Sequence, residues 1–252
     1  MLLTGFPADA FGTNCYVVAP APGEQCVIVD PGIGVVERLD DVLAEHRLRP
    51  AAVILTHGHL DHTFSVTPVC GAKGITAYIH PDDRELLADP GKALSMDPTP
   101  LLGGMQWSEP DDVAELTDGT VVKLAGLEIT VDHAPGHTRG SVLFRLPVDE
   151  RPAETTRMSP GQSGVVSAGR QTDLDAPEVC LSGDVLFAGS IGRTDLPGGD
   201  MDTMLVSLRE KILPLRDEVV VLPGHGPATT IGRERRTNPY LLEVATSEFR
   251  TR

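Results

Sequence analysis

Short runs of aliphatic and β-branched residues alternate along this chain with helical periodicities, which is the pattern of a mixed α/β protein. The runs at 14–19 and 26–30 are joined by a turn containing Pro and Gly, and they predict a β-hairpin. Apolar residues recur at helical spacing over 35–46 and predict a helix there. Further strands are predicted at 52–55, 75–79, 121–124, 127–132, 141–146, 179–184 and 219–222, the last of them. Further helices are predicted at 64–69, at 82–88 and after an N-cap at Asp200 or Asp202.

Two stretches break this alternation. Residues 89–112 contain repeated Pro and Gly together with the only tryptophan, Trp107, so this segment is either a lid over a substrate cleft or a loop packed against the core. Residues 148–178 are polar, rich in Pro, Gly, Ser and Thr, and have predicted strands on both sides. They predict a polar surface insertion within a single domain that spans 1–252.

The charge balance excludes one class of partner. Among 252 residues, 36 are acidic and 21 are basic, which gives a formal net charge of −15. A nucleic-acid binder needs a basic surface to neutralise phosphates, and no run of Lys and Arg precedes 233–236. We therefore expect no nucleic-acid partner.

Hydropathy and cysteine usage suggest the compartment. No apolar run approaches the roughly 20 residues that a membrane-spanning helix needs. The segment 1–10 lacks the basic region of a signal peptide. The cysteines form no CxxC pair, and several stand in apolar runs, as is typical of buried reduced thiols. These features predict a cytoplasmic protein without a membrane partner.

Metal-binding side chains are concentrated directly after the predicted strand 52–55. His57, His59, Asp61 and His62 stand within six positions. On an extended backbone His57 and His59 can point to one side, whereas Asp61 and His62, after the turn, can serve a second ion beside the first. Imidazole and carboxylate ligands without thiolate suit zinc, iron or manganese.

The same arrangement recurs three times later in the chain. His137 follows the tight turn at Pro135–Gly136, Asp184 ends the strand 179–184, and His225 follows the strand 219–222. Asp30, at the end of the strand 26–30, is either an acceptor that orients a ligand histidine or a turn-former before Pro and Gly.

These motifs resemble the metallo-β-lactamase superfamily. The run His57-Gly58-His59-Leu60-Asp61-His62, the isolated histidine, the Asp after Gly and the final Gly-His carry the resemblance, which runs from about Asn14 to Tyr240 apart from 148–178. It implies an α/β (α+β) fold, a four-layer αββα sandwich with metals at one rim. It also implies that His57, His59 and His137 bind one metal, that Asp61, His62 and His225 bind a second, and that Asp184 bridges the two.

Within that superfamily, the segments 182–187, 192–200 and 222–227 are similar to the glyoxalase II-like (hydroxyacylglutathione hydrolase-like) enzymes. The similarity implies a binuclear metallo-hydrolase that cleaves a small-molecule thioester. It implies two divalent metal ions, with zinc as the favoured metal and iron or manganese as alternatives. Few residues follow His225, so we expect no C-terminal glutathione-binding helical domain, and the carrier thiol stays open.

The chemistry expected of such a site is specific. Two cations about 3.5–4 Å apart hold a water between them and lower its pKa to about 7, so that the bridging hydroxide attacks the thioester carbonyl. Asp61 is the candidate catalytic residue, since it could accept the remaining proton. Arg193 is the candidate contact for a substrate carboxylate, with an ion pair to Asp195 as the alternative.

Other functions remain open at this stage. A persulfide dioxygenase of the same superfamily needs one iron ion, which His57, His137 and Asp184 could hold as a facial triad. A lactonase and a non-catalytic metal binder are lesser alternatives. The sequence leaves the acyl group and the oligomeric state undetermined.

Overall fold

The computed structural model describes residues 1–94, 108–148 and 176–247. The predicted insertion at 148–178 and the irregular segment at 89–112 therefore lie largely outside the described residues. The two ends of the predicted insertion at 148–178 lie next to each other, because the backbone N–H of Val148 donates to the carbonyl of Pro177. The described residues on either side of 149–175 are thus hydrogen-bonded to each other.

The N-terminal half forms a six-stranded mixed sheet in the order β1-β2-β3-β4-β5-β6. β1, β2 and β3 pair antiparallel, and β3 to β6 pair parallel. The strands are β1 (Leu2–Pro7), β2 (Asn14–Ala19), β3 (Gln25–Val29), β4 (Arg49–Ile54), β5 (Thr76–Ile79) and β6 (Val113–Glu115).

The second sheet has the order β12-β11-β10-β9-β8-β7, and only β10 and β11 pair parallel. Its strands are β7 (Val121–Leu124), β8 (Leu127–His133), β9 (Val142–Pro147), β10 (Glu178–Gly183), β11 (Val220–Pro223) and β12 (Thr229–Thr230).

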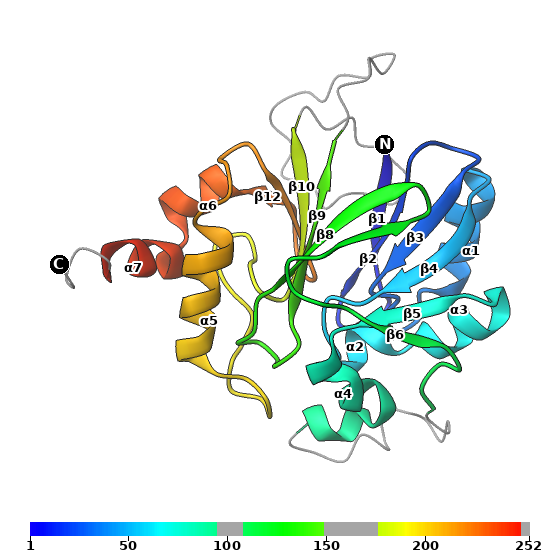
Figure 1. Ribbon diagram of the computed structural model, residues 1–252, viewed down its shortest axis with the longest axis horizontal. Coiled ribbons are helices and arrows are strands. Elements are labelled where there is room, and N and C mark those ends of the chain that lie inside the picture. Colours follow the sequence, from blue (N-terminus) through cyan, green and yellow to red (C-terminus); the bar gives the residue numbers. More distant parts are fainter. Residues whose placement is uncertain (95–107, 149–175, 248–252) are drawn as a thin grey trace.

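Helices cover the outer faces of both sheets, as Figure 1 shows. The helices and helical turns of the first half are α1 (Val36–Glu45), α2 (Leu60–Thr63), α3 (Val66–Lys73), η1 (Pro81–Asp83), α4 (Arg84–Ala88) and η2 (Pro90–Ala93). Of these, α1 and α3 pack on the outer face of the sheet, whereas α4 lies below the strands in Figure 1. In the second half they are α5 (Met201–Ser207), the π-helical turn η3 (Leu208–Ile212), α6 (Ile231–Thr237) and α7 (Pro239–Ser247).

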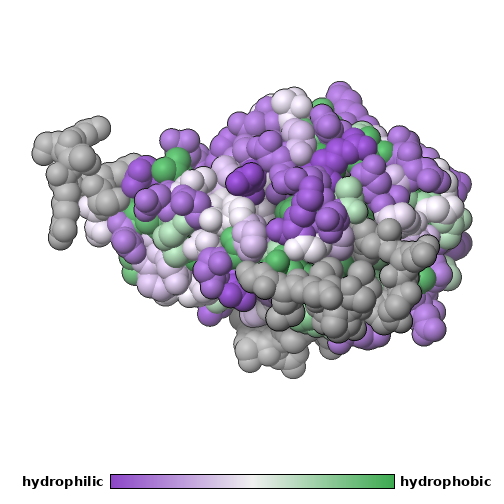
Figure 2. Space-filling model, turned by 90° about the horizontal axis from the view of Figure 1, so that it is seen from below, coloured by the Kyte–Doolittle hydropathy of each residue, from purple (hydrophilic) through white to green (hydrophobic). Residues whose placement is uncertain are grey.

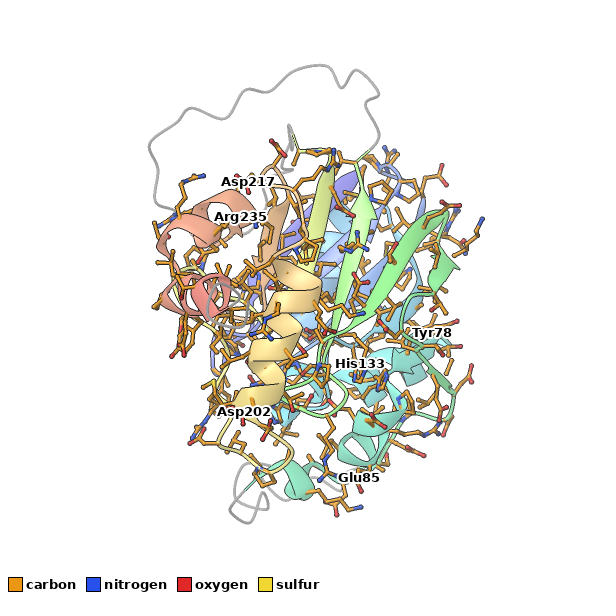
Figure 3. The ribbon with its side chains drawn as sticks, turned by 60° about the vertical axis from the view of Figure 1, so that its left-hand side comes forward. Tyr78, Glu85, His133, Asp202, Asp217 and Arg235 are labelled. Carbon is orange, nitrogen blue, oxygen red and sulfur yellow. The ribbon has the colours of Figure 1, made fainter. Side chains whose placement is uncertain are left out.

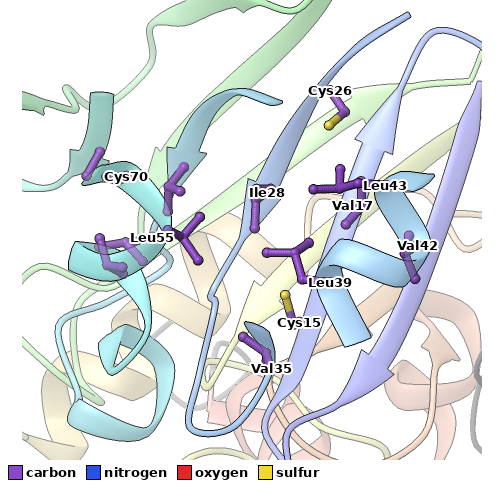
Figure 4. Close-up of a cluster of buried hydrophobic side chains, with 14 of the residues drawn as sticks. Cys15, Val17, Cys26, Ile28, Val35, Leu39, Val42, Leu43, Leu55 and Cys70 are labelled. Carbon is purple, nitrogen blue, oxygen red and sulfur yellow. The ribbon is translucent and has the colours of Figure 1, made fainter. Parts of the chain in front are cut away.

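The alternation of side chains along the strands produces four layers. In β2, Val17 faces outward and packs against α1, whereas Val18 faces the other sheet. In β3, Ile28 faces outward, and Val27 and Val29 face inward. Figure 4 shows the outer cluster, where residues of α1 pack against this sheet. A third cluster joins the second sheet to α5, α6 and α7. This is the αββα sandwich expected from the resemblance.

Most predicted elements are confirmed, with differences at the ends. The hairpin of β2 and β3 and the helix α1 are present as expected. The helix predicted at 64–69 begins later and also ends later, at Lys73. It ends there because Gly74, at φ +62°, adopts the left-handed conformation that glycine tolerates. The strand at 219–222 is not the last, since β12 returns antiparallel to it. No helix within the described ranges has both the length and the apolar character to cross a bilayer.

Candidate metal centre

All seven predicted metal-binding side chains meet at one rim of the sandwich, and both sheets contribute them. His57 and His59 lie in the loop after β4, and Asp61 and His62 lie on α2. From the second sheet, the loops after β8, β10 and β11 supply His137, Asp184 and His225, respectively. The carboxyl ends of strands from the two halves thus converge on one site.

The first group consists of His57, His59 and His137, all buried, with potential ligand atoms within 4.8 Å of one another. The Nε2 atoms of His57 and His137 lie 3.2 Å apart. Two nitrogens bound tetrahedrally to one zinc ion lie about 3.3 Å apart. The three rings stand nearly perpendicular to one another, with interplanar angles of 80° to 86°. Such an arrangement lets three lone pairs point to one centre.

The second group consists of Asp61, His62 and His225. Nε2 of His225 lies 3.1 Å from Oδ2 of Asp61 and 3.3 Å from Nε2 of His62. This group is the more open of the two, since the side chains of His225 and Asp61 are 28% and 23% exposed. A small molecule from solvent would therefore reach the second group first.

Asp184 lies between the groups. Its Oδ1 is 3.4 Å from Nε2 of His62, and its Oδ2 is 3.5 Å from Nε2 of His137 and 3.6 Å from Nε2 of His225. Among the described residues, neither Oδ1 of Asp184 nor Nε2 of His59 has a hydrogen-bond partner, although both atoms are buried. Orphaned buried polar atoms are costly, and bound cations would satisfy both of them. The residues present therefore fit a pair of metal ions.

Asp30 provides the contact proposed for it from the sequence. Its Oδ2 lies 3.0 Å from Nδ1 of His62, so the Nδ1–H can donate to this carboxylate while Nε2 faces the site. The same carboxylate accepts bonds from the backbone N–H of Thr56 at 2.8 Å and from its hydroxyl at 2.6 Å. Asp30 also adopts a left-handed backbone with φ +49°, as the turn-former alternative would require.

Two contacts had no signal in the sequence. Nδ1 of His137 lies 2.7 Å from the carbonyl oxygen of Arg193, to which it can donate, so a backbone atom orients this ring. The hydroxyl of Thr13 donates to Oδ2 of Asp61 at 2.8 Å. The side chain of Arg193 binds both oxygens of Asp195 at 2.7 and 2.8 Å, which is the ion pair foreseen as the alternative. Its contact with substrate stays a prediction.

Arg235 of α6 stabilises the fold. Arg235 donates to Asp217 at 2.8 Å and to the carbonyls of Leu213 and Leu215. In Figure 3, Arg235 and Asp217 lie at the opposite end of α5 from Asp202. Arg235 therefore joins α6 to the segment between η3 and β11.

The electrostatic environment differs between the two groups. Burial, followed by the neighbouring histidines, holds the pKa of His57 well below its usual range, and burial lowers the pKa of His59 to about 3. Burial also opposes protonation of His62 and His225, but the carboxylates of Asp61 and Asp184 outweigh it and raise the pKa of both rings. His57 and His59 are therefore held neutral and ready to coordinate, whereas the raised pKa values of His62 and His225 favour their protonated forms.

This difference predicts where protons are released when metal binds. Below the raised pKa values of His62 and His225, a cation entering their group must displace up to about two protons, because only neutral imidazole coordinates. His57 and His59, whose pKa values are lowered, have no such protons to lose. Zinc added to metal-free protein in weak buffer at pH 6 should release protons mainly with one of its two equivalents, as a pH-stat can record. Equal release with both equivalents, or none, would contradict this assignment.

A further cluster has suitable residue types but unsuitable geometry. His80, Asp82 and His133 also place potential ligand atoms within 4.8 Å of one another. The two rings, however, are stacked at 3.9 Å with an interplanar angle of 10°. Parallel stacked rings direct their in-plane lone pairs side by side, so these two histidines do not converge on one ion as they stand.

Comparison with known proteins identifies the family. The sequence profile described as "Metallo-beta-lactamase superfamily" matches residues 8–150. The chain belongs to the metallo-β-lactamase superfamily. An uncharacterised protein of Mycobacterium tuberculosis is 44% identical over 96% of this chain and 98% of its own length. The hydroxyacylglutathione hydrolase GloC of Haemophilus influenzae is 32% identical over 93% of this chain and 95% of its own.

Solved structures of superfamily members agree with the fold. The BLEG-1 B3 metallo-β-lactamase is 34% identical, with a TM-score of 0.73 over 95% of this chain and 99% of its own. The protein TTHA1623, solved in a di-iron-bound form, is 33% identical, with a TM-score of 0.69 over 94% of this chain and 99% of its own. Family membership and the two His/Asp groups together mark this chain as a metal-dependent hydrolase of the superfamily.

The surface of the protein on the side of α4 is mainly polar. Figure 2 views the molecule from the side on which α4 lies in Figure 1, and hydrophilic residues predominate among those coloured there.

Proposed function

We propose that this protein hydrolyses a small-molecule thioester in the cytoplasm, using two divalent metal ions, zinc first among the candidates. The observation that supports it best is the second group of Asp61, His62 and His225, which is as fully assembled as the first and adjoins it through Asp184. Similarity to GloC over nearly the whole chain supports the thioester class. The four buried free cysteines suit a reducing compartment.

The residues of this chain would divide the work as follows. His57, His59 and His137 would hold one ion, Asp61, His62 and His225 the other, and Asp184 both. When bound, such a pair supplies an activated water and a Lewis acid for the carbonyl oxygen. The leaving thiol has a pKa of about 8.5, so it departs as a thiolate without a separate general acid.

Asp61 is best suited to an ionised role. Burial alone would raise its pKa, but His62 and the hydrogen bonds from His225 and Thr13 outweigh burial and hold the pKa well below its usual range. A carboxylate of this kind is a strong ligand and a weak base. We therefore place metal binding first for Asp61 and acceptance of the proton second.

Arg193 is proposed as the contact for a carboxylate on the substrate. It stands on the loop whose backbone carbonyl orients His137, and its guanidinium is exposed to solvent. Because exposed ion pairs contribute little free energy, a substrate carboxylate could replace Asp195 at small cost. Neutral thioesters would then be poorer substrates than anionic ones.

The alternative function, a persulfide dioxygenase, would leave some of the assembled candidate ligands without a role. One iron ion would need only His57, His137 and Asp184, and the second group would have no part in holding it. The structural similarity to TTHA1623 bears on the metal rather than on the reaction, since that protein was solved with two iron ions. Iron therefore belongs among the metals to be tested in a hydrolase.

The deciding experiment is a paired assay on purified protein loaded with zinc, iron or manganese. We expect hydrolysis of S-lactoylglutathione or of another low-molecular-weight thioester, with two metal ions per chain. Replacing Asp61 with Ala should lower the rate at least about 100-fold, because a ligand is lost. The exposed Asp82, replaced with Asn, is the matched control and should leave it unchanged. Oxygen uptake on a persulfide, or faster cleavage of a β-lactam or lactone than of any thioester, would refute the proposal.

A further inference from the structure

A fully buried carboxylate beside the first metal group has no part in the chemistry above. Asp83 ends η1, is 0% exposed and stands 21 positions or more from every predicted ligand in the sequence. Burying an ionised carboxylate is costly unless several donors compensate it. The function of Asp83 is therefore to be sought in the groups that it binds.

Three donors converge on Asp83, and they come from two loops. The backbone N–H of Gly58 donates to Oδ2 at 2.8 Å, and the hydroxyl of Thr138 donates to the same oxygen at 2.6 Å. The backbone N–H of Gly140 donates to Oδ1 at 2.7 Å. Gly58 stands between His57 and His59, and Thr138 directly follows His137. One carboxylate thus joins the loop of the first sheet that carries two histidines to the loop of the second sheet that carries the third.

The approach of these loops to Asp83 is close enough to require glycine. A Cβ atom at Gly140 would lie 2.7 Å from the Cβ of Asp83. A Cβ atom at Gly58 would lie 2.7 Å from the Cβ of Leu86 and 3.0 Å from the carbonyl oxygen of Asp83. Real Cβ atoms do not approach so closely, so the absence of side chains at these glycines sets the spacing between the loops.

We propose that Asp83 is a positioning residue that fixes the relative placement of His57, His59 and His137 and thereby the affinity of the first group for its metal ion. The carboxylate does so from behind the ligands, through the backbone and the hydroxyl of Thr138, without coordinating the ion. The inference rests on the metal site of the proposed function, but it does not depend on the substrate.

The charge of Asp83 acts in the same direction as its hydrogen bonds. Burial raises the pKa of Asp83, while the bonds from Thr138, Gly58 and Gly140 and the electrostatic interaction with His137 oppose that rise. A carboxylate beside His137 favours positive charge on that side of the site. Asp30 acts differently, because its Oδ2 contacts Nδ1 of His62 directly. It also reaches the first group through the hydroxyl of Thr56, which lies 3.1 Å from Nδ1 of His57.

The test compares the affinities of the two metal sites in variants at Asp83. In Asp83→Asn, the amide must turn its NH₂ toward one of the three donors, so at least one hydrogen bond is lost. Loss of a contact that orients ligands lowers metal affinity about 10- to 100-fold. Zinc titration against a chromogenic chelator should show this loss at one site, with the other site within about threefold. The visible spectrum of the cobalt-substituted protein should change for the weakened site alone. Asp82→Asn, next to it and exposed, is the control and should match the wild type.

A second pair of variants covers the case in which Asp83→Asn does not fold. Thr138→Val removes the hydroxyl that binds Oδ2 of Asp83 but keeps the side-chain volume, whereas Thr138→Ser keeps the hydroxyl. We expect the Val variant to bind one zinc ion about tenfold more weakly and the Ser variant to restore the affinity. Equal affinities in the two variants would overturn the proposal. So would an Asp83→Asn protein that binds both ions as the wild type does, or that weakens both sites equally. Because no substrate is used, failure of the thioester proposal would leave this result intact.

Discussion

Replacing Asp184 with Asn is expected to abolish hydrolysis, with a loss of at least about 1,000-fold in kcat, and to leave fewer than two metal ions per chain. Asp184 is within 3.6 Å of histidines from both groups. Its charge is the one shared between them. Asn has the same shape but no charge, so the two sites lose their common anion at once. Metal analysis and the thioester assay on the same preparation would measure both effects.

The matched control for Asp184 is an acidic residue remote from the site. Asp40 lies on α1, exposed, and pairs with Lys73 at 2.8 Å. Exposed pairs of this kind contribute roughly 0–1 kcal/mol, so Asp40→Asn should keep full activity and full metal content. An Asp184→Asn protein that retains two ions and activity within tenfold of the wild type would show that Asp184 does not bridge the groups.

A single methyl group at Gly224 should be nearly as damaging. A Cβ atom there would collide with Oδ1 of Asp184 and lie 2.6 Å from Cε1 of His62. The ring of His62 cannot move away because Asp30 holds it, and the backbone of Gly224 is itself held by a bond to Gly183. Gly224→Ala is therefore expected to lower hydrolysis about 1,000-fold and to weaken both metal sites. Overpacking of this kind costs about 1–3 kcal/mol of stability, so the protein should still fold.

Gly71 provides the comparison for that experiment. A Cβ at Gly71 meets nothing within 4 Å, and the residue lies in the interior of α3. Alanine there should raise stability by roughly 0.5–1 kcal/mol and leave activity unchanged. Thermal melts of the metal-free proteins would separate folding from metal binding. Wild-type metal affinity in Gly224→Ala would show that the rim adapts more freely than the contacts indicate.

The strands that build the core were predictable because their alternation is strong. Val17, Val18, Val27 and Ile28 stand in apolar runs bounded by a turn, and the sheet follows from them. The short edge strands were not. β6 has three residues, all half-buried or exposed, and β12 has only two residues in total, so neither has enough alternation to be recognised. Their pairing depends on partners far away in the chain.

The candidate ligands were predictable for a different reason. Each stands where a strand or tight turn ends, and His and Asp are conspicuous in such places. The supporting contacts were not predictable. The carbonyl of Arg193 is a backbone atom and leaves no trace in the residue type, and Asp83 reads in the sequence as an ordinary helix-start residue after Pro81. Thr13 stands before a strand, as Thr120 also does, so its position alone does not mark it. Only the packing of the two halves shows what these groups bind.

At the metal rim, each group of candidate ligands combines side chains from both halves of the sandwich. An ion arriving before the halves dock could find His57, His59, Asp61 and His62, but not His137, Asp184 or His225. Full coordination is thus possible only in the folded protein. Each bound ion would therefore link the two halves, and its binding free energy would add to the free energy of unfolding. A chelator would then remove more than activity, because it would also weaken the association of the two halves.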